Sequence, residues 1–126
     1  MLADIDHCCQ QANVWPHAVL AAHAHNCQRY TRVVGNKEIP YIVAGGGGHG
    51  LAKLHRSGYG PIRTPQQITD TLTLENYDDE NYGYLRILVN DAQLRIEYQP
   101  QSDGVTAKTP DDVVTIDLKT QKRVVN

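Results

Sequence analysis

Two histidines, His23 and His25, are the residues of this chain whose type and spacing best suit metal chemistry. They follow an apolar run, residues 18–22, which predicts a short buried strand. Side chains at positions i and i+2 of an extended chain project to the same side, so two imidazoles at a strand end can approach one ion or two adjacent ions. Asn26 and Arg29 come next and are candidates to support the ligands or bind substrate. Histidine pairs also occur by chance on many surfaces, so the surrounding sequence decides the interpretation.

The surrounding sequence resembles a known family. The segments AAHAHNCQRYTR and IPYIVAGGGGHG resemble the last signature, G-H-x-H, of the calcineurin-like metallophosphoesterases (the purple acid phosphatase-like superfamily) and the strand that follows it. This resemblance implies a hydrolase of phosphate esters with a dinuclear centre of iron, manganese or zinc. His23 and His25 would be metal ligands, supported by Asn26 and Arg29.

Two positions depart from the family pattern. Ala22 stands where the family usually has glycine, and Cys27 stands where similar sequences often carry an aromatic residue. Alanine suits ordinary backbone dihedral angles but would conflict with a left-handed turn. The placement of the first histidine therefore depends on the backbone at position 22.

The carboxylates that a dinuclear centre requires are missing from the recognisable motifs. In the family they come from D-x-H, G-D-x-x-D and G-N-H-D/E, and none of these occurs here in order. The nearest substitute, residues 4–7 (DIDH), falls within a helical pattern, where a solvated helix face is the simpler interpretation. We therefore expect residues 1–126 to form a single domain, the C-terminal part of a larger enzyme, with weak or no activity alone. The alternative is a non-catalytic β-rich interaction or structural module in which the histidines merely pack.

Composition excludes several other classes. With 126 residues, 40% of them hydrophobic, the chain can bury a core. Its net charge of −2, from 12 basic and 14 acidic residues, gives no electrostatic footprint for nucleic acid or an anionic membrane. No apolar stretch is long enough for a membrane span, and the first residues lack signal-peptide features. Cys8 and Cys9 are adjacent, a spacing that strains a disulfide, so we expect a reducing, cytoplasmic location.

The glycine cluster at residues 45–48 is not a nucleotide-binding loop. Such a loop requires Lys and then Ser or Thr directly after its last glycine, whereas this chain continues His49-Gly50-Leu51. Four consecutive glycines do allow a close approach of backbone to a ligand or a neighbouring loop. We expect the loop histidines His49 and His55 to be mainly solvent-exposed, and the acidic run at residues 77–80 to be a solvated turn.

The remaining pattern predicts mostly antiparallel β-structure after one helix and one strand. Residues 2–12 are amphipathic at helical spacing, Gly35 and Asn36 suit a hairpin turn, and residues 57–67 have the composition of a loop. Leu85, Ile87 and Val89 are expected to face Leu94, Ile96 and Tyr98 across a second hairpin, while Arg86, Arg95 and Glu97 face water. The expected strands are 18–22, 29–34, 40–44, 71–76, 82–89, 94–99, 113–118 and 123–125.

The predicted fold class is therefore mixed α/β (α+β), a partial metallophosphoesterase ββ-sandwich. A sheet that lacks strands exposes an unpaired edge and an apolar face, which a second chain commonly covers. We accordingly expect a homodimer or a swapped assembly, with a phosphate ester as substrate if the site is complete.

Overall fold

The first sheet is built around the hairpin that the sequence predicts. In the computed structural model, which describes residues 2–55, 58–105 and 109–125, β2 (Cys27–Val34) pairs antiparallel with β3 (Lys37–Ala44). The turn between them contains Gly35, whose φ of +59° is a left-handed conformation that glycine adopts without strain.

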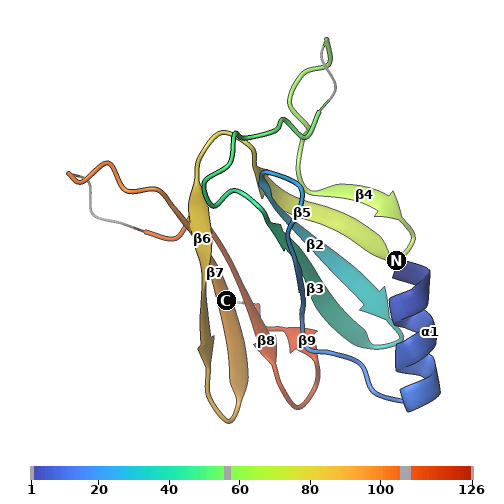
Figure 1. Cartoon of the computed structure of the whole chain (residues 1–126). Coiled ribbons are helices and arrows are strands. Elements are labelled where there is room, and N and C mark those ends of the chain that lie inside the picture. Colours follow the sequence, from blue (N-terminus) through green and yellow to red (C-terminus); the bar gives the residue numbers. More distant parts are fainter. Residues whose placement is uncertain (1, 56–57, 106–108, 126) are drawn as a thin grey trace.

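Three further strands complete this sheet. β1 (Val19–Ala21) pairs parallel with β3, β5 (Leu72–Asp78) pairs with β2, and β4 (Gln66–Thr69) pairs with β5. The strand order is β1-β3-β2-β5-β4. The first sheet is thus antiparallel except at β1, which lies at its edge (Figure 1).

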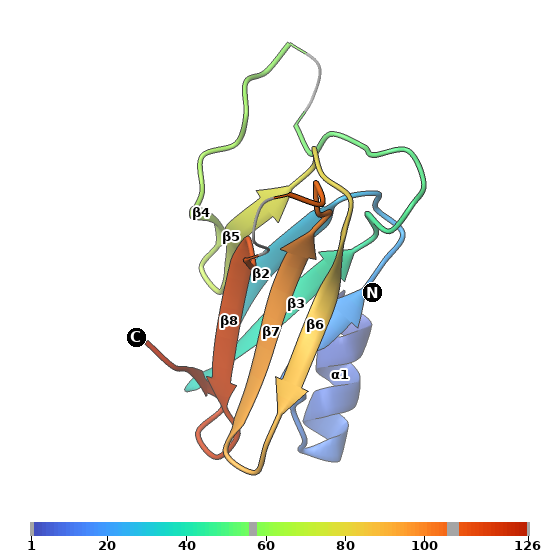
Figure 2. The ribbon, with the colours of Figure 1, turned by 90° about the vertical axis from the view of Figure 1, so that its left-hand side faces the viewer.

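The second sheet consists of four consecutive antiparallel strands, and it lies in front of the first sheet in Figure 2. Its strands are β6 (Gly83–Val89), β7 (Gln93–Pro100), β8 (Asp112–Asp117) and β9 (Lys122–Arg123). The predicted facing of β6 and β7 is confirmed, because Leu85 pairs with Tyr98, Ile87 with Ile96 and Val89 with Leu94. The mixed α+β, mostly antiparallel architecture agrees with the sequence-based expectation.

The core lies between the two sheets. Ile42 of the first sheet packs with Ile96, Val114 and Ile116 of the second, and all four are buried. Ala18, Leu85 and Leu94 add to the rim of this cluster. The two faces are apolar because alternate residues of each strand point inward.

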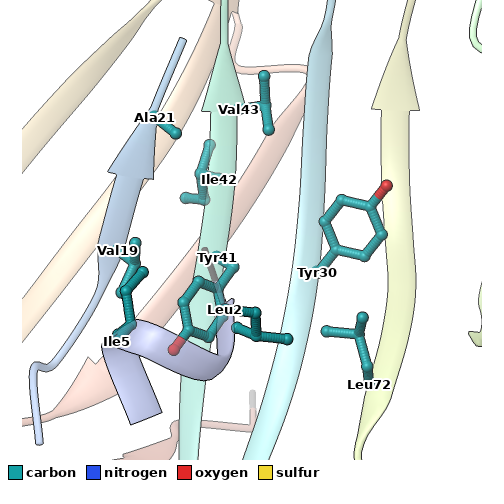
Figure 3. A pocket seen from close by; sticks show the side chains of 9 residues that line it. All are labelled: Leu2, Ile5, Val19, Ala21, Tyr30, Tyr41, Ile42, Val43 and Leu72. Carbon is teal, nitrogen blue, oxygen red and sulfur yellow. The ribbon is translucent and has the colours of Figure 1, made fainter. Parts of the chain in front are cut away.

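The helix α1 (Leu2–Ala12) has the predicted bounds and lies outside the first sheet (Figure 1). None of its residues is fully buried, and an ion pair between Asp6 and Arg32 (2.6 Å) holds it to β2. Beside the helix, the outer face of the sheet has an open hollow of about 190 Å³ (Figure 3). Its lining is apolar apart from the hydroxyls of Tyr30 and Tyr41. No helix of the described residues is long and apolar enough to cross a membrane.

Several expectations about these elements were wrong. The apolar strand β1 is not buried, since it lies at the sheet edge and the side chain of Leu20 is 47% exposed. The predicted loop at residues 57–67 ends earlier, because Gln66 and Gln67 begin the edge strand β4, while Ser57 lies outside the described residues. The last strand stops at Arg123 instead of Val125.

Glu97 was also expected to face water, but it is buried on the outer face of the second sheet. Arg95 Nε donates to it at 2.7 Å, Gln99 donates at 2.9 Å, and Arg86 lies 3.7 Å away. These neighbours, led by the hydrogen bond from Arg95, lower the pKa of its carboxyl group. Neighbouring polar side chains of the same sheet therefore shield the carboxylate of Glu97 from water.

Candidate functional site

The candidate site lies where the carboxyl ends of two neighbouring parallel strands meet. Because β1 and β3 run parallel, the loops that follow them begin at the same end of the first sheet (Figure 1). Residues 22–26 follow β1 and contain the predicted histidines, while residues 45–52 follow β3 and contain the glycine cluster. In open, mostly parallel α/β sheets, ligands bind at the carboxyl ends of the strands, and the single parallel pair of this sheet has that local arrangement.

Backbone hydrogen bonds join the two loops. The Gly45 amide donates to the Asn26 carbonyl (3.0 Å), and the Ala52 amide donates to the His25 carbonyl (2.9 Å). A side chain at position 45 would collide with the carbonyl oxygen of Ala24, so only glycine permits this approach. Gly45, the first glycine of the cluster, therefore allows the loop after β3 to lie against the histidine loop.

Asn26 holds the junction through its side chain. It is 3% exposed, and its Nδ2 donates to the carbonyl of Ala52 at 2.9 Å. Its Oδ1 accepts from Gln28 Nε2 at 2.7 Å, and Gln28 in turn accepts from the Tyr30 hydroxyl at 2.6 Å. Residues 26, 28 and 30 point to one face because strand side chains alternate. Asn26 thus has a positioning role beside the histidines.

The structure places the two predicted histidines differently from each other. His23 is exposed and has a φ of +81°, so the chain turns at this residue and the alternation expected of an extended strand end does not apply. The left-handed residue is His23 and not Ala22, so alanine is compatible with the backbone where the family pattern has glycine. His25 is half-buried.

His25 contacts another imidazole. Its ring lies against that of His49, with centroids 4.2 Å apart and planes inclined by 42°. His49 is exposed, as expected, but the sequence alone did not identify its partner. The sequence offered one indication: His49 directly follows a glycine cluster at the end of one predicted strand, and His25 follows the end of another.

Arg29 of β2 binds a residue of the second sheet. Its guanidinium forms a two-point ion pair with Asp112 of β8, with Nε to Oδ2 at 2.6 Å and Nη2 to Oδ1 at 2.9 Å. Both side chains are largely covered, at 13% and 15% exposure. Nε and Nη2 on one side of the guanidinium both donate to Asp112, so Arg29 links β2 of the first sheet to β8 of the second.

His55 belongs to a separate cluster with Asp79. Its Nδ1 lies 3.9 Å from Asp79 Oδ2, which also accepts from the Leu54 amide at 2.9 Å, and Lys53 Nζ lies 3.5 Å from Oδ1. Asp79 is buried, so the expectation of a fully solvated acidic turn was wrong at this residue. Asp78 does cap the turn, by accepting from the amides of Glu80 and Asn81.

Cys27 is buried, and its thiol is poorly suited to act as a nucleophile. Burial, and then the nearby charges of Asp112, Asp78 and Asp111, raise its pKa from 9.0 to about 12. The thiolate is the reactive form, so this side chain is inert near neutral pH. All three cysteines are free, Cys8 exposed and Cys27 buried.

The site therefore offers imidazole nitrogens at a solvent-accessible loop junction. Among residues 2–55, 58–105 and 109–125, no group of three or more His, Cys, Asp or Glu side chains converges on one metal position. Comparison with known proteins adds nothing to this geometry, because no protein-family model, no curated protein and no solved structure matches the chain.

Proposed function

We propose that this chain is the C-terminal part of a metal-dependent phosphoesterase, to whose dinuclear centre it contributes His23 and His25. The observation that carries the proposal is topological: the histidine loop leaves the carboxyl end of a parallel strand and meets the loop of the adjacent parallel strand. The order of strand, histidine loop, hairpin and glycine cluster is the order that the family resemblance implies. Asn26 supports His25 through the loop junction.

The residues present fit a metal centre only in part. Imidazole nitrogens suit iron, manganese or zinc, and the exposed His23 and half-buried His25 are open to an ion. Two ions held by a full ligand set would polarise a phosphate ester and supply a hydroxide. The carboxylates that such a set needs do not converge with the histidines among the described residues. We therefore propose that the isolated chain has no efficient phosphatase activity.

The test compares the chain with a longer one. An open reading frame upstream of Met1 that encodes D-x-H, G-D-x-x-D and G-N-H-D/E would supply the missing ligands. The extended protein is expected to hydrolyse 4-nitrophenyl phosphate with added Mn²⁺ or Zn²⁺, and His25→Ala should lower turnover at least about a hundredfold. Unrelated sequence upstream, or an inactive extended protein that binds metal, would overturn the proposal. Metal-dependent turnover by the 126-residue chain that vanishes on His25→Ala would overturn its inactivity.

A second function is favoured by the contact between His25 and His49. Two imidazoles that pack on each other suit a non-catalytic β-rich interaction module, in which the histidines only stabilise the loop junction. In that case His25→Ala would lower thermal stability and leave phosphate-ester hydrolysis by the extended protein unchanged. For either function we propose a reducing, cytoplasmic location, because the cysteines are odd in number and Cys8 and Cys9 are adjacent in sequence.

A further inference from the structure

The loop after β3 brings a second imidazole to the histidine loop, and it was not part of the predicted ligand pair. His25 and His49 have ring centroids 4.2 Å apart, with a 42° inclination that departs from parallel stacking. One ring is half-buried and the other exposed, so an ion can reach them from solvent. Within the described residues, neither ring shares a hydrogen bond or ion pair with another side chain or the backbone. In the part of the chain that the structure describes, no protein group therefore occupies their ring nitrogens.

The backbone, and not side-chain packing alone, holds the two rings near each other. The Ala52 amide bonds to the carbonyl of His25 itself, and the Gly45 amide bonds to the next residue, Asn26. On the other side of the glycine loop, the Gly83 amide donates to the carbonyl of Gly46 at 3.1 Å. Both ends of the loop that carries His49 are thus fixed. Pre-positioned ligands bind more tightly because less conformational entropy is lost on binding.

We propose that His25 and His49 together bind one divalent transition-metal ion of the zinc, nickel or copper class. Two imidazoles that share an ion through bonds of about 2.1 Å have ring centroids about 4.6 Å apart at a right angle and about 5.3 Å apart in tetrahedral geometry, so the rings need to separate by only about 1 Å or less. Imidazole suits these ions, and water completes the coordination. This site differs from the His23–His25 pair of the proposed phosphoesterase, and it does not depend on that function.

The experiment is a calorimetric titration of the full chain with Zn²⁺. A Cys8→Ser/Cys9→Ser background removes the thiols of α1, which would bind zinc beside His7. In this background we compare His49→Ala, His23→Ala and the matched control His7→Ala, which is exposed on the helix. We expect one ion per chain, an affinity that falls about tenfold or more in His49→Ala, and unchanged binding in His7→Ala. His23→Ala tests whether the ligand pair of the proposed phosphoesterase binds the ion instead.

A second measurement avoids any effect of the substitutions on folding. In NMR spectra of the unsubstituted rings, Zn²⁺ is expected to shift the ring resonances of His25 and His49 together and to leave those of His23 in place. If binding instead survives in His49→Ala and is lost in His23→Ala, the inference is wrong and the ligand pair of the proposed phosphoesterase is supported. Unshifted His25 and His49 resonances at saturating Zn²⁺ would overturn the inference as well.

Discussion

Arg29 and Asp112 form a two-point ion pair that joins β2 of the first sheet to β8 of the second. Its two bonds are 2.6 and 2.9 Å long, and both side chains are largely covered. The guanidinium fork matches a carboxylate in geometry, which makes such pairs stronger than single contacts. Because these residues are 83 positions apart in the sequence, the pair is a long-range link between the sheets.

Removing one partner of this pair should be costly. In Asp112→Asn, Arg29 keeps its charge in a covered position without a counter-charge, and we expect the free energy of unfolding to fall by about 2–4 kcal/mol. Urea denaturation followed by circular dichroism measures the change. Asp91→Asn, at an exposed position in the turn between β6 and β7, is the matched control and should change stability by less than about 0.5 kcal/mol. A loss in Asp112→Asn no larger than in the control would contradict a structural role for the pair.

Gly45 offers a second test, because its lack of a side chain permits the loop junction. In Gly45→Ala the new methyl group meets the carbonyl of Ala24, so we expect a loss of about 1–3 kcal/mol in urea denaturation. Gly47→Ala is the control, since nothing lies within 4 Å of a Cβ at that position. Equal stabilities of the two variants would show that the loops do not approach as closely as described.

Local sequence patterns predicted the hairpins. The features that the sequence did not predict, such as the edge position of β1, depend on long-range contacts. The turn at Gly35 and the alternation in β6 and β7 are set by neighbouring residues, so they could be read directly. The apolar composition of β1 does not say whether a strand lies at an edge, which depends on its neighbours in space. The short strand β4 was hidden because its polar residues follow a proline-rich segment.

The same distinction applies to the site. The position of His25 after a strand is a local feature, whereas its contact with His49 depends on the parallel pairing of β1 with β3. Arg29 stands close to the histidines in sequence, yet its partner Asp112 lies on the other sheet, and no local pattern indicates that pairing. The residue types therefore identified candidate site residues, whereas the pairing of the strands determines which of these residues are in contact.

The buried thiol of Cys27 gives a prediction about pH and reactivity. Ellman's reagent at pH 8 should label two thiols per folded chain, those of Cys8 and Cys9, and the third only after unfolding. Because the folded-state pKa of Cys27 is raised from 9.0 to about 12, the folded chain retains this proton as the unfolded chain loses it. This group's contribution to stability should therefore be lost as the pH rises from about 9 to 12. Cys27→Ser should lack that component, and rapid labelling of three thiols in the folded chain would contradict the burial.

The outer edge of β6 leads to a prediction about self-association. The Asn90 amide bonds to the Gln93 carbonyl, and because antiparallel pairs alternate, the backbone groups of Leu85, Ile87 and Val89 point away from β7. Ile87 and Val89 are 46% and 65% exposed, and the strand contains neither proline nor lysine, residues that commonly protect an edge.

We expect two copies of the chain to pair antiparallel through β6, centred on Ile87. Centring the pair on Arg86 would place two like charges opposite each other, whereas centring on Ile87 places Arg86 opposite Leu88. Solution scattering should give the mass of a dimer, and Ile87→Lys should give that of a monomer because it charges the interface. In the Cys8→Ser/Cys9→Ser background, Ile87→Cys should form an intermolecular disulfide. Val89→Cys should not, because its two copies would lie about 14 Å apart. A monodisperse monomer of the unsubstituted chain, or equal cross-linking at both positions, would contradict this pairing.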